Sequence, residues 1–417
     1  MVKFLFTFAL LCCIRVTLLY GQSITEKQFG VEINNNKDGY GFIDSILGDK
    51  KLVLLGELDH GDGTSFIVKT DLIKYLHENH NFNTLAFEAS FINCNFLWNV
   101  IGDSTNFKSK LKNSLYYIWS EVEETKNLFC YIEEQYQKGT PLKIVGIDPQ
   151  FSGAENAQEF ICILKNSLPL NITESKQFAE FVHELEIMSA WMVFPKKKQH
   201  QLSEYEFMHY CDELYEAISK NHDQAINLPL WKMYIDNVKI MGKIKQDRTN
   251  LAFEIRDKQM FENINYWLQD TANEKMIVWA ANAHIIRKDN VLEQKGKKFY
   301  LLGLKKMGDY LYENYPNSLY AIGITSGKGS TLNFSNPISK NVIKNPDNNS
   351  AEGLLHGKKT CFVDLKLFEN SMGLEKYASQ LFYTNIICTA KWSQHLDGLI
   401  YIPEMRPSTP LWQNNKR

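Results

Sequence analysis

Short apolar runs that end at polar or small residues recur along this 417-residue chain. The first occupies residues 51–55, Lys-Leu-Val-Leu-Leu, and stops at Gly56. Further runs of this kind occupy residues 84–87, 142–146, 276–280, 318–325 and 398–402. A short run that is apolar on both faces and closed by Gly or polar residues is typical of a strand buried in a parallel sheet.

A helical pattern separates the first two of these strands. Residues 65–79 place apolar side chains at helical spacing on one stripe, and Asn81 ends the pattern. The stripe consists of Ile67, Leu72, Ile73 and Leu76. A helix between two such strands forms a right-handed crossover, so the strands run parallel and open on the same edge of the sheet.

The middle of the chain is helical throughout. Residues 91–135 and about 154–270 have helical spacing and no strand signal, whereas residues 331–360 are rich in Asn, Ser, Gly and Lys and predict a long loop. The fold class is therefore α/β: a mixed, mostly parallel sheet flanked by helices. The residues of about 154–270 form an inserted helical subdomain that caps the crevice of the sheet.

Composition and charge narrow the class of protein. The chain is 44% apolar and 23% charged, and its net charge of −2 argues against nucleic acid as a partner. Lys3 and the apolar run 4–14 predict a signal peptide over residues 1–21, and hence export to the periplasm or secretion. Arg15 interrupts this apolar segment, and no other stretch is long and apolar enough to span a bilayer, so we expect no stable membrane span once the signal is removed.

Acidic and imidazole side chains follow four of the predicted strands. Glu57 and His60 follow the first, Glu88 the second, Asp148 the third and His284 the strand at 276–280. Residues just beyond the carboxyl ends of parallel strands line the ligand crevice of open α/β sheets. We therefore expect these side chains to meet in one acid–base site.

Each of these residues also has a purely structural interpretation. Glu57 could cap the following helix, His60 could bind loop backbone, and Asp148 is a common residue at strand ends. Glu88 directly follows an apolar strand, where a carboxylate is costly unless it is paired. Their joint occurrence at one sheet edge is what favours a site.

The residue types predict hydrolysis by an activated water. His60 can act as a general base near neutral pH, with Glu57 or Glu88 orienting the imidazole or the water. His284 can stabilise the developing oxyanion or protonate the leaving group. The chain has neither a G-x-S-x-G motif nor an H-E-x-x-H motif. A metal interpretation stays open, because a Glu57–His60 pair could also bind zinc, manganese or iron.

Several blocks of the chain resemble the erythromycin esterase family, in the family's order. They are Gly56–Gly61, Leu85–Ala89, Gly146–Asp148, Ile255–Asp257, Val278–His284, Met307–Leu311 and Tyr320–Gly323. The resemblance implies that residues 22–417 form one erythromycin esterase-like domain. It also implies hydrolysis of a macrolide lactone by a histidine-activated water, which would inactivate the antibiotic.

Carried over residue by residue, the resemblance makes His60 the base, supported by Glu57 and Glu88 and completed by His284. It places Arg256 near the cleft. With Asp148 and Asn282, this arginine is expected to bind substrate. The chain departs from the family at Asp59, where the family has a small residue or Thr before its histidine. This departure alters the mouth of the site and the expected specificity for macrolides.

The leading hypothesis is an exported, metal-independent hydrolase of a bulky carboxylic ester, with a small-molecule ester as partner and no cofactor. One alternative is a divalent-metal-dependent hydrolase that uses the same histidines and carboxylates. The other is a non-catalytic exported protein whose cleft only binds a ligand.

Overall fold

The computed structural model describes residues 31–33, 37–98, 104–189, 196–221, 227–246, 249–269, 275–294, 299–334, 339–344 and 346–412. The predicted signal peptide, residues 1–21, lies outside them. None of the helices within these ranges is long and apolar enough to cross a membrane. The six cysteines in these ranges are all unpaired, and four of them are buried.

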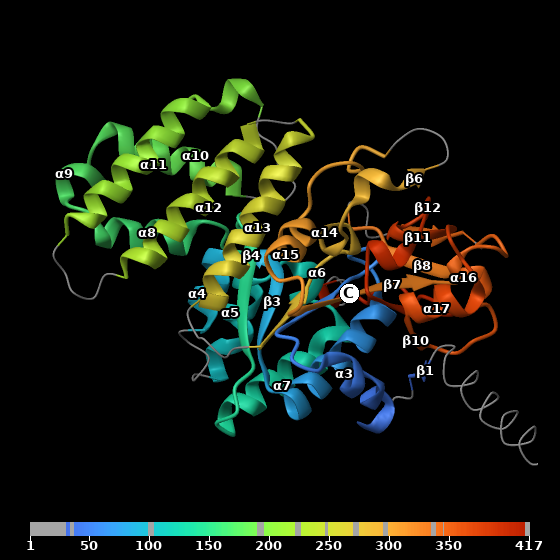
Figure 1. Ribbon diagram of the computed structural model, residues 1–417. Helices are drawn as coiled ribbons and strands as arrows, with labels where there is room; N and C mark the ends of the chain where they lie inside the picture. Colours follow the sequence, from blue (N-terminus) through green and yellow to red (C-terminus); the bar gives the residue numbers. More distant parts are fainter. Residues whose placement is uncertain are drawn as a thin grey trace, which may run out of the picture.

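One eight-stranded sheet organises the molecule (Figure 1). Its strands are, in spatial order, β1 (Val31–Glu32), β10 (Cys361–Asp364), β13 (Gly398–Ile402), β7 (Leu319–Ser326), β2 (Leu52–Leu55), β5 (Lys275–Trp279), β3 (Phe82–Ser90) and β4 (Lys143–Asp148). The six strands from β13 to β4 run parallel, while β10 and β1 add an antiparallel edge. The sequence-based prediction of a mixed, mostly parallel sheet is confirmed.

Both faces of the parallel strands are buried, which explains their continuous apolar runs. In β2, Leu52 and Leu54 face one core, and Val53 and Leu55 face a second core on the other side of the sheet. All four side chains are fully buried. Alternate side chains point to opposite faces of a strand, so a strand covered on both sides has no polar face.

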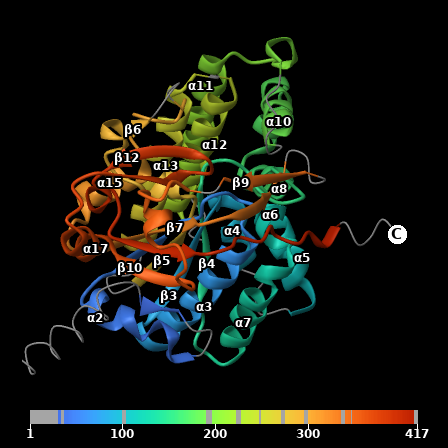
Figure 2. The same cartoon turned by 90° about the vertical axis from the view of Figure 1, so that its right-hand side faces the viewer.

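Helices form a layer on each side of the sheet (Figures 1 and 2). On one side lie α3 (Gly63–His80), α5 (Ser104–Ser114), α6 (Tyr117–Ser120) and α7 (Lys126–Gln137). On the other side lie α15 (Met307–Asn314), α17 (Leu365–Met372) and the helices that connect β4 to β5. Helix α4 (Phe91–Trp98) directly follows β3 and contributes side chains to both cores.

The connection from β4 to β5 is the helical insertion, drawn in green to yellow at the upper left of Figure 1. Its helices are α8 (Gln158–Ser167), α9 (Leu170–Thr173), α10 (Lys176–Ser189), α11 (Glu204–Ser219), α12 (Leu228–Gln246) and α13 (Leu251–Gln269). The last helix packs back on the sheet, where Trp267 Nε1 and Asn263 Nδ2 donate to backbone carbonyls of β4 at 3.2 and 2.7 Å. These bonds fix α13 against the strand end that carries Asp148.

Helix α3 differs in detail from its predicted stripe. It begins two residues earlier, and Asn81 ends it in the left-handed conformation at φ 57°, donating its N–H to the Leu76 carbonyl. Ile67 is 43% exposed, whereas the charged side chain of Lys69 is fully buried. Leu72, Ile73 and Leu76 of the predicted stripe are fully buried, so only Ile67 departs from it, and the buried face also includes the ammonium group of Lys69.

The prediction of a long loop over residues 331–360 is wrong in part. Strands β8 (Gly329–Leu332) and β9 (Lys340–Ile343) pair antiparallel in a small separate sheet, and α16 (Ala351–Leu354) follows. Val342 in β9 is 66% exposed. Such short strands have no apolar run, so composition alone makes them look like loop. A third sheet joins β11 (Tyr377–Tyr383), β12 (Ile386–Ala390) and β6 (Glu293–Gln294).

Candidate active site

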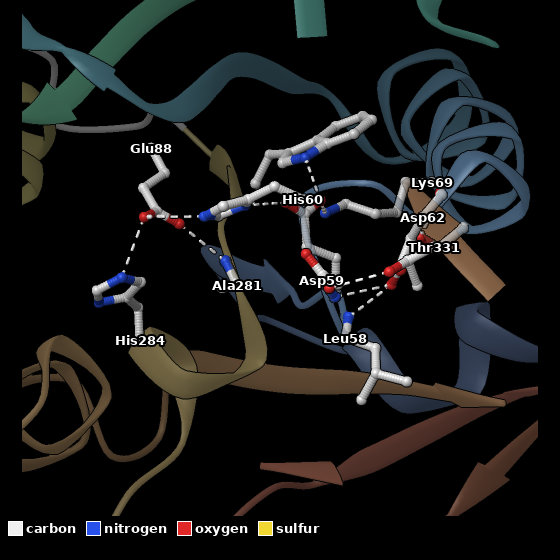
Figure 3. Close-up of polar contacts among 12 residues, drawn as sticks. Leu58, Asp59, His60, Asp62, Lys69, Glu88, Ala281, His284 and Thr331 are labelled. Carbon is white, nitrogen blue, oxygen red and sulfur yellow. Dashed lines mark hydrogen bonds and ion pairs between the residues drawn. The ribbon is translucent and has the colours of Figure 1, made fainter. Parts of the chain in front are cut away.

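Strand order brings the predicted site residues together. Strands β2, β5, β3 and β4 are consecutive neighbours in the sheet, although β5 comes last of the four in the sequence. Their carboxyl ends deliver, in this order, Glu57 with His60, then His284, Glu88 and Asp148. The first four of these side chains form one connected polar cluster (Figure 3).

Glu57 is buried at the centre of the first half of the cluster. Its Oε1 lies 2.8 Å from Nδ1 of His60. Its Oε2 accepts from Lys69 Nζ at 2.9 Å and from Trp279 Nε1 at 2.7 Å. Burial alone would raise the pKa of this carboxyl, but Lys69 and His60 outweigh it and lower the pKa. Glu57 is therefore a fixed carboxylate that holds one nitrogen of His60.

His60 is the exposed member of the pair, with 31% of its side chain accessible. Because Nδ1 donates to Glu57, the neutral ring presents an unprotonated Nε2, which lies 4.0 Å from Oε1 of Glu88. The ring also meets Trp119 edge to face at 5.5 Å. Burial lowers the pKa of His60, but the bond to Glu57 and the charges of Glu88, Glu57 and Asp59 raise it overall.

Asp62 fixes the turn that carries His60. Its Oδ2 accepts from the backbone N–H groups of Leu58 and Asp59 at 2.8 and 3.0 Å (Figure 3). Burial, with the charges of Asp59 and Glu57, raises the pKa of Asp62 well above its usual range. These two bonds hold the backbone of the turn that leads into His60.

Glu88 lies at an irregularity in β3. The register of β3 against β4 shifts between Phe87 and Ser90, so Glu88 falls at a bulge beyond the regular ladder. Bulges of this kind re-aim a side chain next to a site. Gly146 of β4 makes the bulge fit, since a Cβ there would lie 2.0 Å from the Ser90 carbonyl oxygen.

Glu88 accepts hydrogen bonds through both oxygens. Oε2 accepts from the backbone N–H of Ala281 at 2.9 Å. Oε1 lies 2.9 Å from Arg256 Nη2 and 3.0 Å from His284 Nε2. Burial opposes ionisation, but His284, His60 and Arg256 together hold the pKa of Glu88 well below its usual range.

His284 is enclosed by carboxylates at both ring nitrogens. Nδ1 lies 2.7 Å from Oδ1 of Asp257, which also accepts from the Met307 N–H at 3.1 Å. Nε2 lies 3.0 Å from Glu88 Oε1 and 3.1 Å from Arg256 Nη1. Burial lowers the pKa of His284, but Asp257 and Glu88 raise it to about 9. The ring is thus an imidazolium at neutral pH, and it donates to Glu88 rather than accepting from Arg256.

Arg256, on α13, joins the helical insertion to the sheet. Nε and Nη2 donate to the two oxygens of Asp148 at 3.2 and 2.6 Å, and Nη2 also donates to Glu88. Asp148 is fully buried and accepts from Tyr116 at 3.4 Å. No carboxylate of the described residues binds Nη1 of Arg256. Nη1 lies against Nε2 of His284, and that nitrogen cannot accept its hydrogen bond when the ring is protonated.

Two residues expected to bind substrate lie elsewhere. Asp148 lies behind Arg256 and orients it, without lining the cavity. Asn282 is also fully buried, and its amide bonds both ways with the Ile324 backbone of β7 at 2.7 and 3.1 Å. It sits so close to Gly56 that a Cβ there would lie 1.9 Å from its oxygen. The structure does not bring Asn282 into the site.

Lys69, Trp279 and Asp257 hold the site residues and were not among the predicted ones. The sequence does indicate that Lys69 is unusual. It lies three and four positions before Leu72 and Ile73, so its charge falls on the buried stripe of a helix. A charge there needs a buried partner. Trp279, inside an apolar strand, and Asp257, beside Arg256, give no such signal.

The cluster opens into a cavity of about 600 Å³. The ionisable side chains of its lining include Asp59, His60, Glu88, Arg256 and His284. Its walls are mostly aromatic and aliphatic, from the helical insertion (Ile244, Ala252, Phe253), the α6 region (Tyr116, Ile118, Trp119), the β8–β9 sheet (Leu332, Phe334) and the residues Tyr300, Leu301 and Tyr383. This size and lining suit a large, partly apolar ligand.

The donor set does not favour a resident metal. Both oxygens of Glu57 are used by His60, Lys69 and Trp279, so Glu57 and His60 do not form a chelating pair. Beside Glu88, the Arg256 guanidinium already supplies the positive charge. Across the described ranges, no group of three or more His, Cys, Asp or Glu residues could hold a metal ion.

Comparison with known proteins gives consistent matches. The model of a family described as erythromycin esterase matches residues 77–405, which include Glu88, Arg256 and His284 but start after His60. The Bacillus subtilis (strain 168) protein YbfO, which carries the provisional name of a hydrolase, is 29% identical over 398 residues, or 90% of this chain and 88% of that protein. Erythromycin esterase type II of Escherichia coli is 23% identical over 94% of this chain and 99% of its own length. A solved erythromycin esterase mutant in its open conformation superposes with a TM-score of 0.68 at 16% identity, covering 90% of this chain and 96% of that structure.

Proposed function

Because this chain belongs to the erythromycin esterase family, we propose that it hydrolyses a bulky carboxylic ester with a water molecule activated by His60. The observation that carries the proposal is the different surroundings of the two ring nitrogens of His60. Nδ1 of His60 is held by the buried carboxylate of Glu57, while Nε2 faces a cavity of about 600 Å³. This arrangement keeps a basic nitrogen directed at a bound substrate.

The spacing of His60 and Glu88 suits a shared water. Nε2 and Oε1 are 4.0 Å apart, so one water can donate a hydrogen bond of about 2.8 Å to each of them. The water oxygen then directs a lone pair away from both acceptors and toward the cavity. Glu88 orients this water and, through its charge, favours the imidazolium that forms when His60 takes the proton.

The reaction then follows a general-base course. The water oxygen bonds to the ester carbonyl carbon as its proton passes to His60 Nε2, and the carbonyl becomes an oxyanion. As the tetrahedral intermediate collapses, the bond from carbon to the alkoxy oxygen breaks. His60 returns its proton to that oxygen, and the products are a carboxylic acid and an alcohol.

Arg256 and His284 supply positive charge for the oxyanion. Nη1 of Arg256 is the donor of this pair that binds no carboxylate within the described ranges, because Nε and Nη2 are used by Asp148 and Glu88. Both nitrogens of His284 are engaged by carboxylates, so His284 acts through its charge rather than by proton transfer. Charge placed where the oxyanion develops is effective in a site walled by apolar groups.

The substrate class follows from the shape of the cavity. Its volume and its aromatic and aliphatic walls suit a ring or a long acyl chain, and a macrolide lactone is the candidate that its family relatives indicate. We further propose that the protein acts after export, as its amino-terminal sequence indicates, and that it requires no metal.

A turnover screen tests the proposal. The purified protein is incubated with macrolide lactones and with simple aryl and alkyl esters, with and without a strong chelator. Hydrolysis that survives the chelator supports the proposal, and activity that the chelator abolishes and a divalent metal restores favours the metal-dependent alternative. Retention of a ligand with no turnover of any ester favours the binding-protein alternative.

A further inference from the structure

Asp59 is a charge in the cavity that no cation among the described residues neutralises. Its Oδ2 accepts from two neutral groups, Thr331 Oγ1 at 2.9 Å and Asn341 Nδ2 at 3.1 Å. Asp59 is half-buried, lines the cavity and directly precedes His60. Figure 3 shows it directed toward Thr331, on the far side of His60 from Glu88.

The other carboxylate of the cavity lining is compensated. Glu88 is bonded to the Arg256 guanidinium and to the His284 imidazolium. Asp62 and Glu57, in the same turn as Asp59, are also acidic, and the Lys69 ammonium is already bound to Glu57. A half-buried carboxylate of this kind gains free energy from a cation that enters the cavity.

The cavity that Asp59 lines also has tyrosine rings in its wall. Tyr383 and Tyr300 line the same cavity, and Tyr383 stacks on Phe299 at 5.3 Å. Burial raises the pKa of the Tyr383 hydroxyl, and the charge of Asp59 raises it further. Faces of aromatic rings beside a carboxylate form the usual recognition site for an ammonium group.

We propose that the substrate carries a positively charged amine or quaternary ammonium group, and that Asp59 with the aromatic wall of Tyr383 and Tyr300 binds it. This inference rests on the proposed ester hydrolysis and names the substrate class of that same site. Because Asp59 directly precedes His60, the cation lies close to the scissile ester. Asp59 is thus a specificity-determining residue, and a neutral residue at this position would not discriminate by charge.

Two esters of one acid test the proposal. A choline ester and the 3,3-dimethylbutyl ester of the same acid have the same shape and differ by the charge on one atom. We expect the wild-type protein to favour the choline ester by about tenfold or more in kcat/KM, the effect of one charge-assisted contact. Asp59→Asn keeps an oxygen for Thr331 and Asn341, and it should remove this preference, so that the ratio of kcat/KM for the two esters falls toward one.

The matched control is Asp236→Asn, which removes the same charge from the exposed ion pair with Lys232 on α12. It should leave the preference for the choline ester unchanged. Kinetics are compared at the pH plateau of each protein, because Asp59 also raises the pKa of His60. An equal preference in wild type and Asp59→Asn would overturn the inference even though both esters are cleaved.

A binding measurement separates this inference from the proposed function. Benzyltrimethylammonium contains no ester, and its affinity is measured by calorimetry against the full chain. Binding to the wild type that weakens about tenfold in Asp59→Asn supports the inference even if no ester is hydrolysed. No binding, or equal binding by both proteins, overturns it regardless of esterase activity.

Discussion

His60 and His284 approach the same oxygen, Oε1 of Glu88, at 4.0 and 3.0 Å. Their second ring nitrogens are both held by carboxylates, Glu57 for His60 and Asp257 for His284. Only His60 has a nitrogen open to the cavity. The two rings therefore differ in function: His284 stays protonated, and His60 can exchange a proton with a bound water.

Replacing the base tests its assignment. His60→Gln should lower kcat by about 10²- to 10⁴-fold, because general-base catalysis of this kind is lost. The exposed imidazole leaves no cavity in a core, so circular dichroism and thermal unfolding should be close to wild type. His209→Gln, on the solvent face of α11, is the matched control and should keep full activity. Unchanged turnover in His60→Gln would remove His60 from the mechanism.

The pH profile of kcat/KM should have an acid limb above pH 6.5. His60 must be unprotonated to accept a proton, and its surroundings raise its pKa above the usual 6.5. Activity should therefore fall as the pH drops through that raised pKa. Asp59→Asn removes one of the charges that raise it, so its acid limb should move to lower pH. A limb that stays in place would show that another group controls it.

The stability of the fold should reflect the ionisation of His284. Its pKa rises from 6.5 to about 9 on folding, so its contribution is complete below pH 6.5 and is lost as the pH rises toward 9. The contribution should be roughly 3 kcal/mol in the free energy of unfolding. Lys69 and Lys245 have lowered pKa values of about 8 and titrate in the opposite sense, so His284→Gln must be compared with wild type at each pH.

Urea titrations at pH 6, 7.5 and 9 provide this comparison. The destabilisation caused by His284→Gln should be largest at pH 6 and smallest at pH 9. A difference that does not change with pH would mean that the ring is not held as an imidazolium.

Variants of the buried pair Glu57 and Lys69 distinguish an effect on stability from an effect on catalysis. Glu57→Gln leaves the Lys69 ammonium without its partner, and we expect a loss of about 3–5 kcal/mol in unfolding free energy. The double variant Glu57→Gln/Lys69→Met removes both charges and should recover much of that loss. Its activity should stay low, because Nδ1 of His60 still lacks a carboxylate. Recovery of activity together with stability would show that Glu57 acts only on the fold.

Gly146 should be required for the position of Glu88. In Gly146→Ala the new Cβ would meet the Ser90 carbonyl oxygen, so the bulge of β3 must move. We expect a destabilisation of about 1–3 kcal/mol and a lower kcat at a nearly unchanged KM. Gly41→Ala, where the nearest atom would be 3.7 Å away, is the tolerant control. Wild-type kinetics in Gly146→Ala would mean that the bulge does not aim the carboxylate.

The apolar runs were sufficient to predict the parallel sheet and the edge on which the site forms. They identify strands buried on both faces, and parallel strands carry their following residues to one edge. This direction brings Glu57, His60, Glu88 and His284 to one edge, where the bulge of β3 then aims Glu88. The order of the strands was not predictable in this way, because nothing in a local pattern says that β5 lies between β2 and β3.

The role of each side chain inside the polar cluster was harder to predict from the sequence. Asn282 lies in a motif next to His284, yet its amide is used by the β7 backbone. Asp257 holds His284, but its neighbour Arg256 is the more conspicuous residue of the pair. Which side chain turns to the cavity and which to the core depends on tertiary packing, and residues adjacent in sequence can differ in this.

The position of β5 also sets the order in which the protein matures during synthesis. β2 and β3 leave the ribosome early, but the strand that hydrogen-bonds to both of them is translated only after the whole helical insertion. Until Lys275–Trp279 enters the gap, His284, Arg256 and the Ala281 N–H are not in place around Glu88. A nascent chain thus lacks the full cluster around Glu88 until about two thirds of its 417 residues, up to His284, have been made.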